Sequence, residues 1–259
     1  MSRVIALANQ KGGVGKTTTA INLASNLAKQ GKKVLVIDLD PQGNTTSGLG
    51  VDKNSVGNSV YELLIDDCPL EETVLSLEFS GFREKRKLWL IPSKVDLAGA
   101  EMELGEMQEK VYILKKRTTP IREKYDYILI DCPPSLSLLT VNALTTADSV
   151  LIPVQCEYYA LEGLAQLLDT IGLIRERLNE DLDIEGLVFT MYDSRINLSR
   201  QVIEDVRENL DVYIFDQVIP RNVRLAEAPS YGEPVDFYDR KSAGAKAYRK
   251  LAKELIRKG

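Results

Sequence analysis

Two lysines and two threonines stand in a glycine-rich run near the start of the chain. The run is Lys11-Gly12-Gly13-Val14-Gly15-Lys16-Thr17-Thr18, between a short apolar run and a segment of helical periodicity. Glycines let successive backbone N–H groups turn toward an anion, and a helix N-terminus adds unpaired N–H groups. We expect Lys16 to reach the β- and γ-phosphates of a nucleotide and the Thr17 hydroxyl to ligate Mg²⁺. The run therefore predicts a phosphate-binding loop whose eight residues contact nucleotide.

Three aspartates follow apolar runs that are typical of buried strands. Asp38 and Asp40 end one such run, and Asp131 ends another. Acidic residues at the carboxyl ends of parallel strands lie on the ligand side of an open α/β sheet. We predict Asp38 and Asp131 in the Mg²⁺ shell and Asp40 as the residue that orients the attacking water, or a weak base. The alternative for each is a turn-forming aspartate, and the division of roles between Asp38 and Asp40 stays open because strand side chains alternate.

The composition excludes several other chemistries. The chain has 259 residues, no histidine and three cysteines, with 33 Lys and Arg against 38 Asp and Glu. Without histidine there is no Ser-His-Asp triad and no His metal ligand. Cys68, Cys132 and Cys156 are scattered, which excludes a four-ligand zinc site within one chain and is typical of a reduced, cytoplasmic protein. Any metal is then an oxygen-preferring ion such as Mg²⁺.

Short apolar runs alternate with segments of helical period. The runs are Val4–Ala8, Val34–Ile37, Leu88–Ile91, Tyr127–Ile130, Val150–Val154, Leu187–Thr190 and Tyr213–Ile219. Helices are expected near 17–30, 95–117, 137–146, 158–179, 197–209 and 244–257. This alternation predicts one domain over residues 1–259, an α/β fold with a doubly wound, mostly parallel sheet flanked by helices. Segments 43–60 and 220–243 are loop-rich, and long loops in a compact fold are often functional.

The phosphate loop departs from the ordinary pattern in one position. Gln10 stands where the pattern G-x-x-x-x-G-K-[ST] has its first glycine, and Lys11 opens the loop. The run resembles the deviant Walker A motif of the ParA, MinD and nitrogenase-iron-protein class of ATPases. That resemblance implies that Lys11 reaches across a dimer to the partner subunit's phosphates and, with Lys16 and Asp40, takes part in catalysis. A local phosphate contact or a solvated charge is the alternative for Lys11.

Further segments narrow the resemblance to the chromosomal ParA (Soj) proteins. They are Asp38–Gly50, Asp131–Ser135, Pro153–Gly163 and Ile219–Pro229, so the likeness spans almost the whole chain. It implies an ATP- and Mg²⁺-dependent homodimer that hydrolyses ATP slowly and binds double-stranded DNA without sequence preference. A ParB-like (Spo0J-like) centromere-binding partner would stimulate hydrolysis and release the DNA. The base would contact Met191, Pro220 and Asn222.

DNA binding by an acidic chain requires a local basic patch. The sequence pI is about 5.1, yet segment 240–259 holds eight Lys and Arg against one Glu. We predict that Lys246, Arg249 and Lys250 contact DNA; the alternative is a solvated outer face of a packed helix. The resemblance also implies Arg195 and Arg224 in two surface loops, each of which could instead form a surface ion pair.

Two other functions fit the same nucleotide machinery. A MinD-like membrane-cycling ATPase ends in an amphipathic helix that enters lipid, but the last helix here offers Leu251, Leu255 and Ile256 and no Phe or Trp. An iron–sulfur electron carrier needs a cysteine context that this chain lacks. With no apolar stretch near the roughly 20 residues of a bilayer span, we expect a cytoplasmic, nucleoid-associated protein with no membrane partner.

Overall fold

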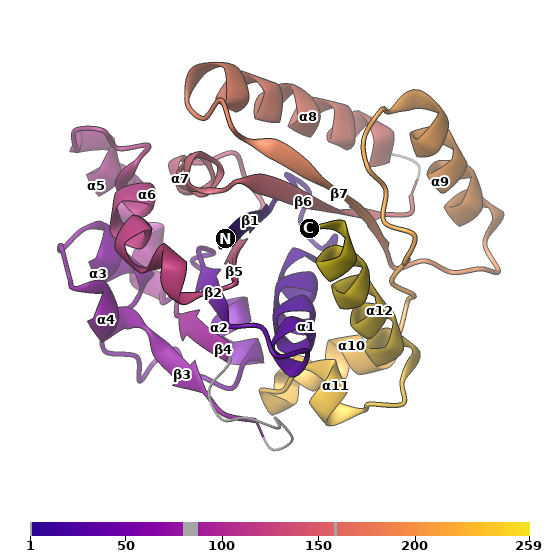
Figure 1. Ribbon diagram of the computed structural model, residues 1–259, viewed down its shortest axis with the longest axis horizontal. Helices are drawn as coiled ribbons and strands as arrows, with labels where there is room; N and C mark the ends of the chain where they lie inside the picture. Colours follow the sequence, from indigo (N-terminus) through magenta and orange to yellow (C-terminus); the bar gives the residue numbers. More distant parts are fainter. Residues whose placement is uncertain (1, 80–87, 158–159) are drawn as a thin grey trace.

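A seven-stranded sheet runs through the molecule in the order β3-β4-β2-β5-β1-β6-β7 (Figure 1). The computed structural model describes residues 2–79, 88–157 and 160–259. The strands are β1 (Arg3–Leu7), β2 (Val34–Asp38), β3 (Leu75–Leu77), β4 (Leu88–Ile91), β5 (Tyr127–Asp131), β6 (Ser149–Gln155) and β7 (Asp183–Thr190). All neighbouring strands pair in parallel except the edge strand β3, which runs antiparallel to β4. The predicted α/β class and mostly parallel sheet are confirmed.

Helices cover both faces of the sheet. They are α1 (Lys16–Lys29), α2 (Asn44–Gly48), α3 (Val60–Leu64), α4 (Leu70–Thr73), α5 (Ala100–Glu106), α6 (Ile113–Thr118), α7 (Leu138–Thr146), α8 (Ala160–Arg177), α9 (Asn197–Asn209), α10 (Val223–Glu227), α11 (Val235–Tyr238) and α12 (Ala243–Lys258), with 3-10 turns at Val95–Ala98, Thr119–Lys124 and Ala228–Tyr231. In Figure 1, α1 and α12 lie on one face of the sheet and α7 and α8 on the other. Strand side chains alternate between the two cores: Val4 and Ala6 pack on the α7 side, Ile5 and Leu7 on the α1 side. Burial on both faces explains the continuous apolar runs.

The register of three central strands sets the position of the site. Leu7 at the end of β1 pairs with Asp131 at the end of β5, and Asp131 pairs with Asp38 at the end of β2. The two carboxylates therefore stand side by side, directly beside the strand that leads into the phosphate loop. A ligand site at the carboxyl edge of the sheet follows from this register.

The periodicity predicted one helix over 95–117, and this prediction was wrong. A 3-10 turn, α5 and α6 replace it, with Glu109 in the left-handed region at φ 51°. Asn142 of α7 fills the gap: its amide donates to the Lys110 carbonyl at 2.8 Å and its oxygen accepts from the Leu114 N–H at 3.2 Å. Those backbone groups are satisfied by a side chain from another helix, so the helix is interrupted.

The predicted strand at 213–219 was wrong. Only isolated bridges form there, between Leu187 and Ile214 and between Tyr192 and Pro220. The Glu254 carboxylate of α12 accepts the N–H groups of Asp216 at 2.7 Å and Gln217 at 3.2 Å. Backbone donors that a further strand would place in a ladder are thus taken by a helix side chain. The short edge strand β3 was missed, and the first two residues of the predicted helix 158–179 lie outside the described residues.

The two loop-rich segments contact each other beside the site. Segment 43–60 contains α2, and segment 220–243 contains α10 and α11. Gly50 and Gly232 meet backbone to backbone, and a Cβ added at Gly232 would lie 2.7 Å from the Gly50 Cα. Both glycines also have positive φ, so a side chain at either position would separate the segments.

One buried carboxylate links both ends of the chain at the amino ends of the strands, opposite the edge that carries the phosphate loop. Glu185 of β7 is 2% exposed and accepts from Arg3 at 2.6 Å, from Ser149 at 2.8 Å and from Lys258 at 2.9 Å. Favourable hydrogen bonds and charges keep the pKa of Glu185 below its usual value despite its burial. No helix among residues 2–79, 88–157 and 160–259 is long and apolar enough to cross a membrane.

Candidate functional site

The phosphate loop leaves β1 and enters α1 through two glycines with left-handed backbone. Gly13 has φ 76° and Gly15 has φ 92°, a conformation that residues with a Cβ rarely adopt. The Thr190 hydroxyl at the end of β7 donates to the Val14 carbonyl at 2.7 Å, and the Asn9 side chain accepts from the Lys11 N–H at 3.0 Å. The loop is therefore held by side chains on both of its sides.

The two lysines of the loop occupy different environments. Lys16 is 6% exposed, and its Nζ donates to the Lys11 carbonyl at 3.2 Å, inside the curve of the loop. Burial lowers the pKa of Lys16, while the Asp131 carboxylate opposes that shift. The Lys11 side chain is 46% exposed and pairs with Glu157, which follows β6. Lys16 is thus buried inside the loop, whereas Lys11 lies on the side of the loop that is open to solvent, called the open side below.

Asp131 receives hydroxyl donors from two segments. Its Oδ2 accepts from Thr17 at 2.8 Å and from Thr45 at 2.7 Å. Its Oδ1 is buried with no hydrogen-bond partner. Burial raises the pKa of Asp131 above its usual value, and the two hydroxyl donors oppose the rise. An unpartnered carboxylate oxygen beside a threonine hydroxyl is a suitable place for a cation.

Asp38 is buried beside Asp131 and is held by one residue of α2. Its Oδ2 accepts from both the backbone N–H of Thr46, at 2.8 Å, and the Thr46 hydroxyl, at 2.7 Å. Burial and the neighbouring Asp131 charge raise the pKa of Asp38. Two adjacent buried carboxylates repel each other, so a divalent cation or a proton stabilises the pair.

Asp40 lies on the turn that follows β2. It is 8% exposed, and its Oδ1 accepts from the Gln42 N–H at 2.9 Å. The Asp40 N–H lies 3.3 Å from Asp38 Oδ1. Among the described residues no donor hydrogen-bonds the second carboxylate oxygen of Asp40, so that oxygen is available to a water or ligand.

The residues at this edge fit a magnesium ion. Mg²⁺ keeps several waters and takes one or two carboxylates together with phosphate oxygens. Thr17, Asp38 and Asp131, the predicted ligand set, are brought together by the strand register and the hydroxyl contacts above. Within the described part of the chain no cluster of three or more His, Cys, Asp or Glu residues could hold a metal ion.

A cavity of about 450 Å³ opens next to the phosphate loop. Its lining contains Gly15, Thr18, Thr190, Met191, Ile219, Pro220, Arg221, Asn222, Val223, Leu225, Ala226 and Tyr248. The three residues predicted to contact the base, Met191, Pro220 and Asn222, all lie in this lining. Met191 has φ 52°, and Asn222 Oδ1 is buried without a partner. A mostly apolar cavity with a few polar groups fits a purine ring.

Several residues of the site had no chemical signal in the sequence. Tyr248 of α12 lines the cavity and hydrogen-bonds Thr19 at 3.0 Å. Thr45 and Thr46 orient the two carboxylates, yet only the family resemblance singled out their segment. Threonines and tyrosines are common residues, so their type alone predicts no role in a site. Their roles follow from hydrogen bonds that only the folded structure shows.

The two loop arginines are both engaged in surface ion pairs. Arg195 is 86% exposed and pairs with Asp193 at 2.7 Å. The pair lowers the pKa of Asp193 to about 2. Arg224 pairs with Glu227 at 2.7 Å and with Asp239 at 3.4 Å. Exposed pairs of this kind contribute little to stability, because water and salt screen them.

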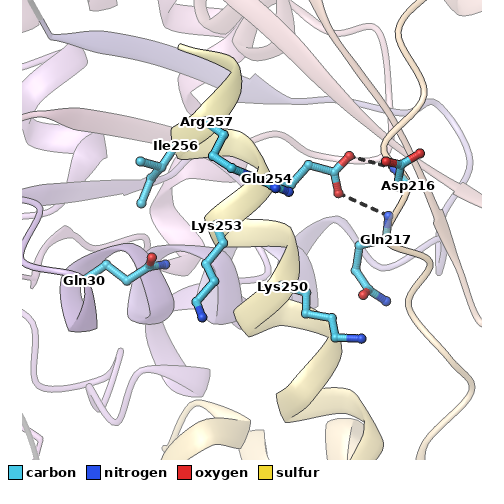
Figure 2. Close-up of a pocket in the computed structure, with 8 residues that line it drawn as sticks. All are labelled: Gln30, Asp216, Gln217, Lys250, Lys253, Glu254, Ile256 and Arg257. Atoms are coloured by element: carbon cyan, nitrogen blue, oxygen red, sulfur yellow. Dashed lines mark hydrogen bonds between the residues drawn. The ribbon is translucent and has the colours of Figure 1, made fainter.

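Helix α12 presents lysines beside a second cavity of about 490 Å³ (Figure 2). Figure 2 shows Lys250 and Lys253 pointing away from Glu254, whose carboxylate accepts the N–H groups of Asp216 and Gln217. Lys246 and Lys250 are exposed, and neither has an ion-pair partner among the described residues. Arg249 differs, because it pairs at 2.5 Å with the buried Asp236, which also binds Lys29.

The chain is similar in sequence to proteins of known families. A family model described as an AAA domain matches residues 2–184. The sporulation initiation inhibitor protein Soj of Bacillus subtilis is 52% identical over 259 residues, with all of both chains covered. The chromosome partitioning protein ParA of Myxococcus xanthus is 49% identical over all of this chain and 89% of its own length.

Solved structures show the same fold. A cobyrinic acid a,c-diamide synthase from Mycobacterium smegmatis, with bound ADP and magnesium, matches with a TM-score of 0.86 and 38% identity, covering 99% of this chain and 95% of the other. The cell division ATPase MinD of Pyrococcus furiosus matches with a TM-score of 0.82 and 27% identity, covering all of both chains.

Proposed function

Because the chain belongs to the ParA/Soj family of chromosome-partitioning ATPases, we propose that it is a DNA-segregation ATPase switched by ATP. It binds ATP with Mg²⁺ and hydrolyses ATP slowly. With ATP bound it forms a homodimer that binds double-stranded DNA without sequence preference. Hydrolysis, stimulated by a ParB-like centromere-binding protein, returns it to the unbound state.

One observation carries the proposal, namely the separation of the two loop lysines. Lys16 lies inside the loop, where it serves the phosphates of its own nucleotide, while Lys11 is half exposed on the open side. A cation on the open side can reach a nucleotide held by a second copy. Supplying that charge in trans makes hydrolysis depend on dimerisation, as an arginine finger does.

The carboxylates and threonines at the sheet edge bind the metal and the water. Thr17, Asp38 and Asp131 would hold Mg²⁺, which neutralises developing charge on the phosphate oxygens when bound. Thr45 and Thr46 keep the two carboxylates oriented. Asp40, with one free oxygen on the following turn, orients the attacking water.

The DNA-binding surface combines Arg195 and Arg224 with the exposed lysines of α12. ATP-driven pairing of two subunits would double this patch, and contacts to DNA phosphates would dominate binding. The apolar side chains Tyr248, Leu251 and Leu255 of α12 are buried in the core. They are therefore not available to enter lipid, which favours DNA over a membrane surface as the partner.

The testing experiment measures the mass of the protein in solution with ATP and Mg²⁺, with and without duplex DNA. Wild type is compared with Lys11→Ala, Lys16→Ala and Asp40→Ala. We expect wild type to dimerise with ATP and Asp40→Ala to remain a DNA-bound dimer, because it binds ATP but hydrolyses it much more slowly than wild type does. Lys16→Ala should lose the response to nucleotide, and Lys11→Ala should bind ATP yet stay monomeric.

A dimer formed equally well by Lys11→Ala would contradict the role of this lysine in trans. An Asp40→Ala protein that stays monomeric with ATP would contradict the ATP switch itself. Sedimentation with anionic liposomes, run beside sedimentation with DNA, separates a DNA partner from a membrane partner.

A further inference from the structure

Ser93 is a buried serine that follows β4 by two residues, next to the catalytic turn. It is 0% exposed. Because β4 pairs in parallel with β2, with Ile91 opposite Ile37, the chain after β4 runs beside the segment that carries Asp38 and Asp40. Its position at the carboxyl edge of the sheet is therefore fixed by strand register.

Ser93 makes two hydrogen bonds to the segment that follows β2. Its hydroxyl donates to the backbone carbonyl of Asp40 at 2.8 Å. Its N–H donates at 2.9 Å to the hydroxyl of Thr46, which in turn donates to Asp38 at 2.7 Å. One residue thus holds the backbone of the predicted water-orienting aspartate and, through Thr46, the carboxylate of the predicted metal ligand.

The turn also packs closely against Ser93. Gly43 has φ 61°, and a Cβ added there would lie 3.3 Å from the Ser93 carbonyl. This close contact prevents the turn between Asp40 and α2 from moving toward the end of β4, and movement away would break the hydrogen bonds of Ser93.

We propose that Ser93 is a positioning residue for ATP hydrolysis, which sets where the Asp40 carboxylate stands relative to the attacking water. The inference rests on the proposed function, since it assigns Ser93 a part in the same site. It touches neither nucleotide nor water itself; it acts through the Asp40 backbone and through Thr46. Small displacements of an orienting group are costly, because a shift of about 1 Å can reduce a rate on the order of 100-fold.

The first test compares Ser93→Ala with wild type by ATP turnover with duplex DNA and by titration with a fluorescent ATP analogue. We expect kcat to fall about tenfold while the dissociation constant for the analogue changes by less than roughly twofold, because the contact matters only to the reacting geometry. Ser93→Thr retains the hydroxyl and should recover most of kcat.

Ser149→Ala is the matched control, since Ser149 is also a buried serine that donates one hydrogen bond, to Glu185 at 2.8 Å. It lies at the opposite edge of the sheet and should lower the melting temperature without lowering kcat. Should Ser93→Ala prove unfolded at the assay temperature, Ser93→Cys is the near-isosteric replacement with a weak donor. Its kcat is expected to fall in the same direction.

The decisive measurement couples Ser93 to Asp40. If Ser93 acts through Asp40, adding Ser93→Ala to Asp40→Ala should lower kcat no further, whereas independent effects would multiply. Multiplying effects, or an unchanged kcat in Ser93→Ala, would overturn the inference. An Asp40→Ala protein with normal turnover would instead overturn the proposed function, so the two failures are distinguishable.

Discussion

At the scale of single residues, two adjacent buried carboxylates destabilise the folded protein when both are ionised. Asp38 and Asp131 are both 0% exposed, and burial raises the pKa of each above the ordinary value of 3.8. The folded protein therefore binds their protons more tightly than the unfolded chain does. Without a cation, this pair contributes stability below about pH 4 that is lost as the pH rises through the raised pKa values.

We predict that Asp131→Asn stabilises the nucleotide-free protein at neutral pH. The asparagine oxygen can still accept from Thr17 and Thr45, and the variant no longer buries the second negative charge. The free energy of unfolding should rise by about 1–2 kcal/mol, since one pKa unit corresponds to about 1.4 kcal/mol. Urea unfolding from pH 5 to pH 8 measures this, and the gain over wild type should grow with pH.

The same substitution should abolish the extra stability that wild type gains from ATP with Mg²⁺, because it removes a carboxylate that we propose as a metal ligand. Asp181→Asn, at an exposed carboxylate, is the control and should change neither quantity. If Asp131→Asn raised the free energy of unfolding equally at every pH, the ionisation of Asp131 would not be the cause of the gain.

Residue types and spacing predicted the phosphate loop and the three aspartates, and the structure places these groups at one edge of the sheet. Ser93 could not be found in this way. Its role depends on the Asp40 carbonyl and the Thr46 hydroxyl, and those neighbours are set by strand register. A single serine after a strand has no signal of its own.

At the scale of elements, α12 combines a packed face with a charged face. Its apolar side chains and the buried Tyr248 fix it against α1, while Lys246 and Lys250 face solvent. Arg249 lies between the two faces and binds the buried Asp236. Three residues with one predicted role therefore have different environments.

We predict that Lys246→Ala and Lys250→Ala weaken DNA binding without changing thermal stability. Arg249→Ala should destabilise the fold by about 1–3 kcal/mol, because a buried carboxylate loses one of its charged hydrogen-bond partners. Thermal unfolding and filter binding of the three variants separate the effects. An Arg249→Ala protein as stable as wild type would contradict the structural role of this pair.

Local periodicity predicted most of the central strands and main helices. It failed at two segments whose backbone N–H or C=O groups hydrogen-bond a side chain of another helix. The run at 213–219 is apolar like a strand, but Glu254 takes two of its N–H groups. The helix expected at 95–117 is interrupted where Asn142 binds Lys110 and Leu114. Both partners are distant in sequence, so no window of local sequence contains them.

At the scale of the whole molecule, the proposed DNA binding requires a basic patch of limited size, because the protein as a whole is acidic. Arg195 and Arg224 are exposed and held only by surface ion pairs. We predict that Arg195→Ala and Arg224→Ala weaken ATP-dependent binding similarly for duplexes of different sequence. Each lost phosphate contact should also reduce the salt dependence, by about 0.9 in the slope of log K against log salt concentration.

Gel shifts across a salt series measure both quantities, and ATP turnover without DNA should persist in both variants. Arg175→Ala, in the last turn of α8, serves as a control for the loss of one positive charge elsewhere. Undiminished binding by both loop variants would contradict the patch.

The buried contact of Glu185 with Arg3 and Lys258 has a practical consequence. It brings the two ends of the polypeptide together at the start of β1, whereas the phosphate loop follows the end of that strand. A fluorescent tag fused at either end would therefore stand clear of the nucleotide and of any second copy facing it. Joining the ends by a short linker and opening the chain elsewhere would yield a circular permutant with the catalytic edge intact.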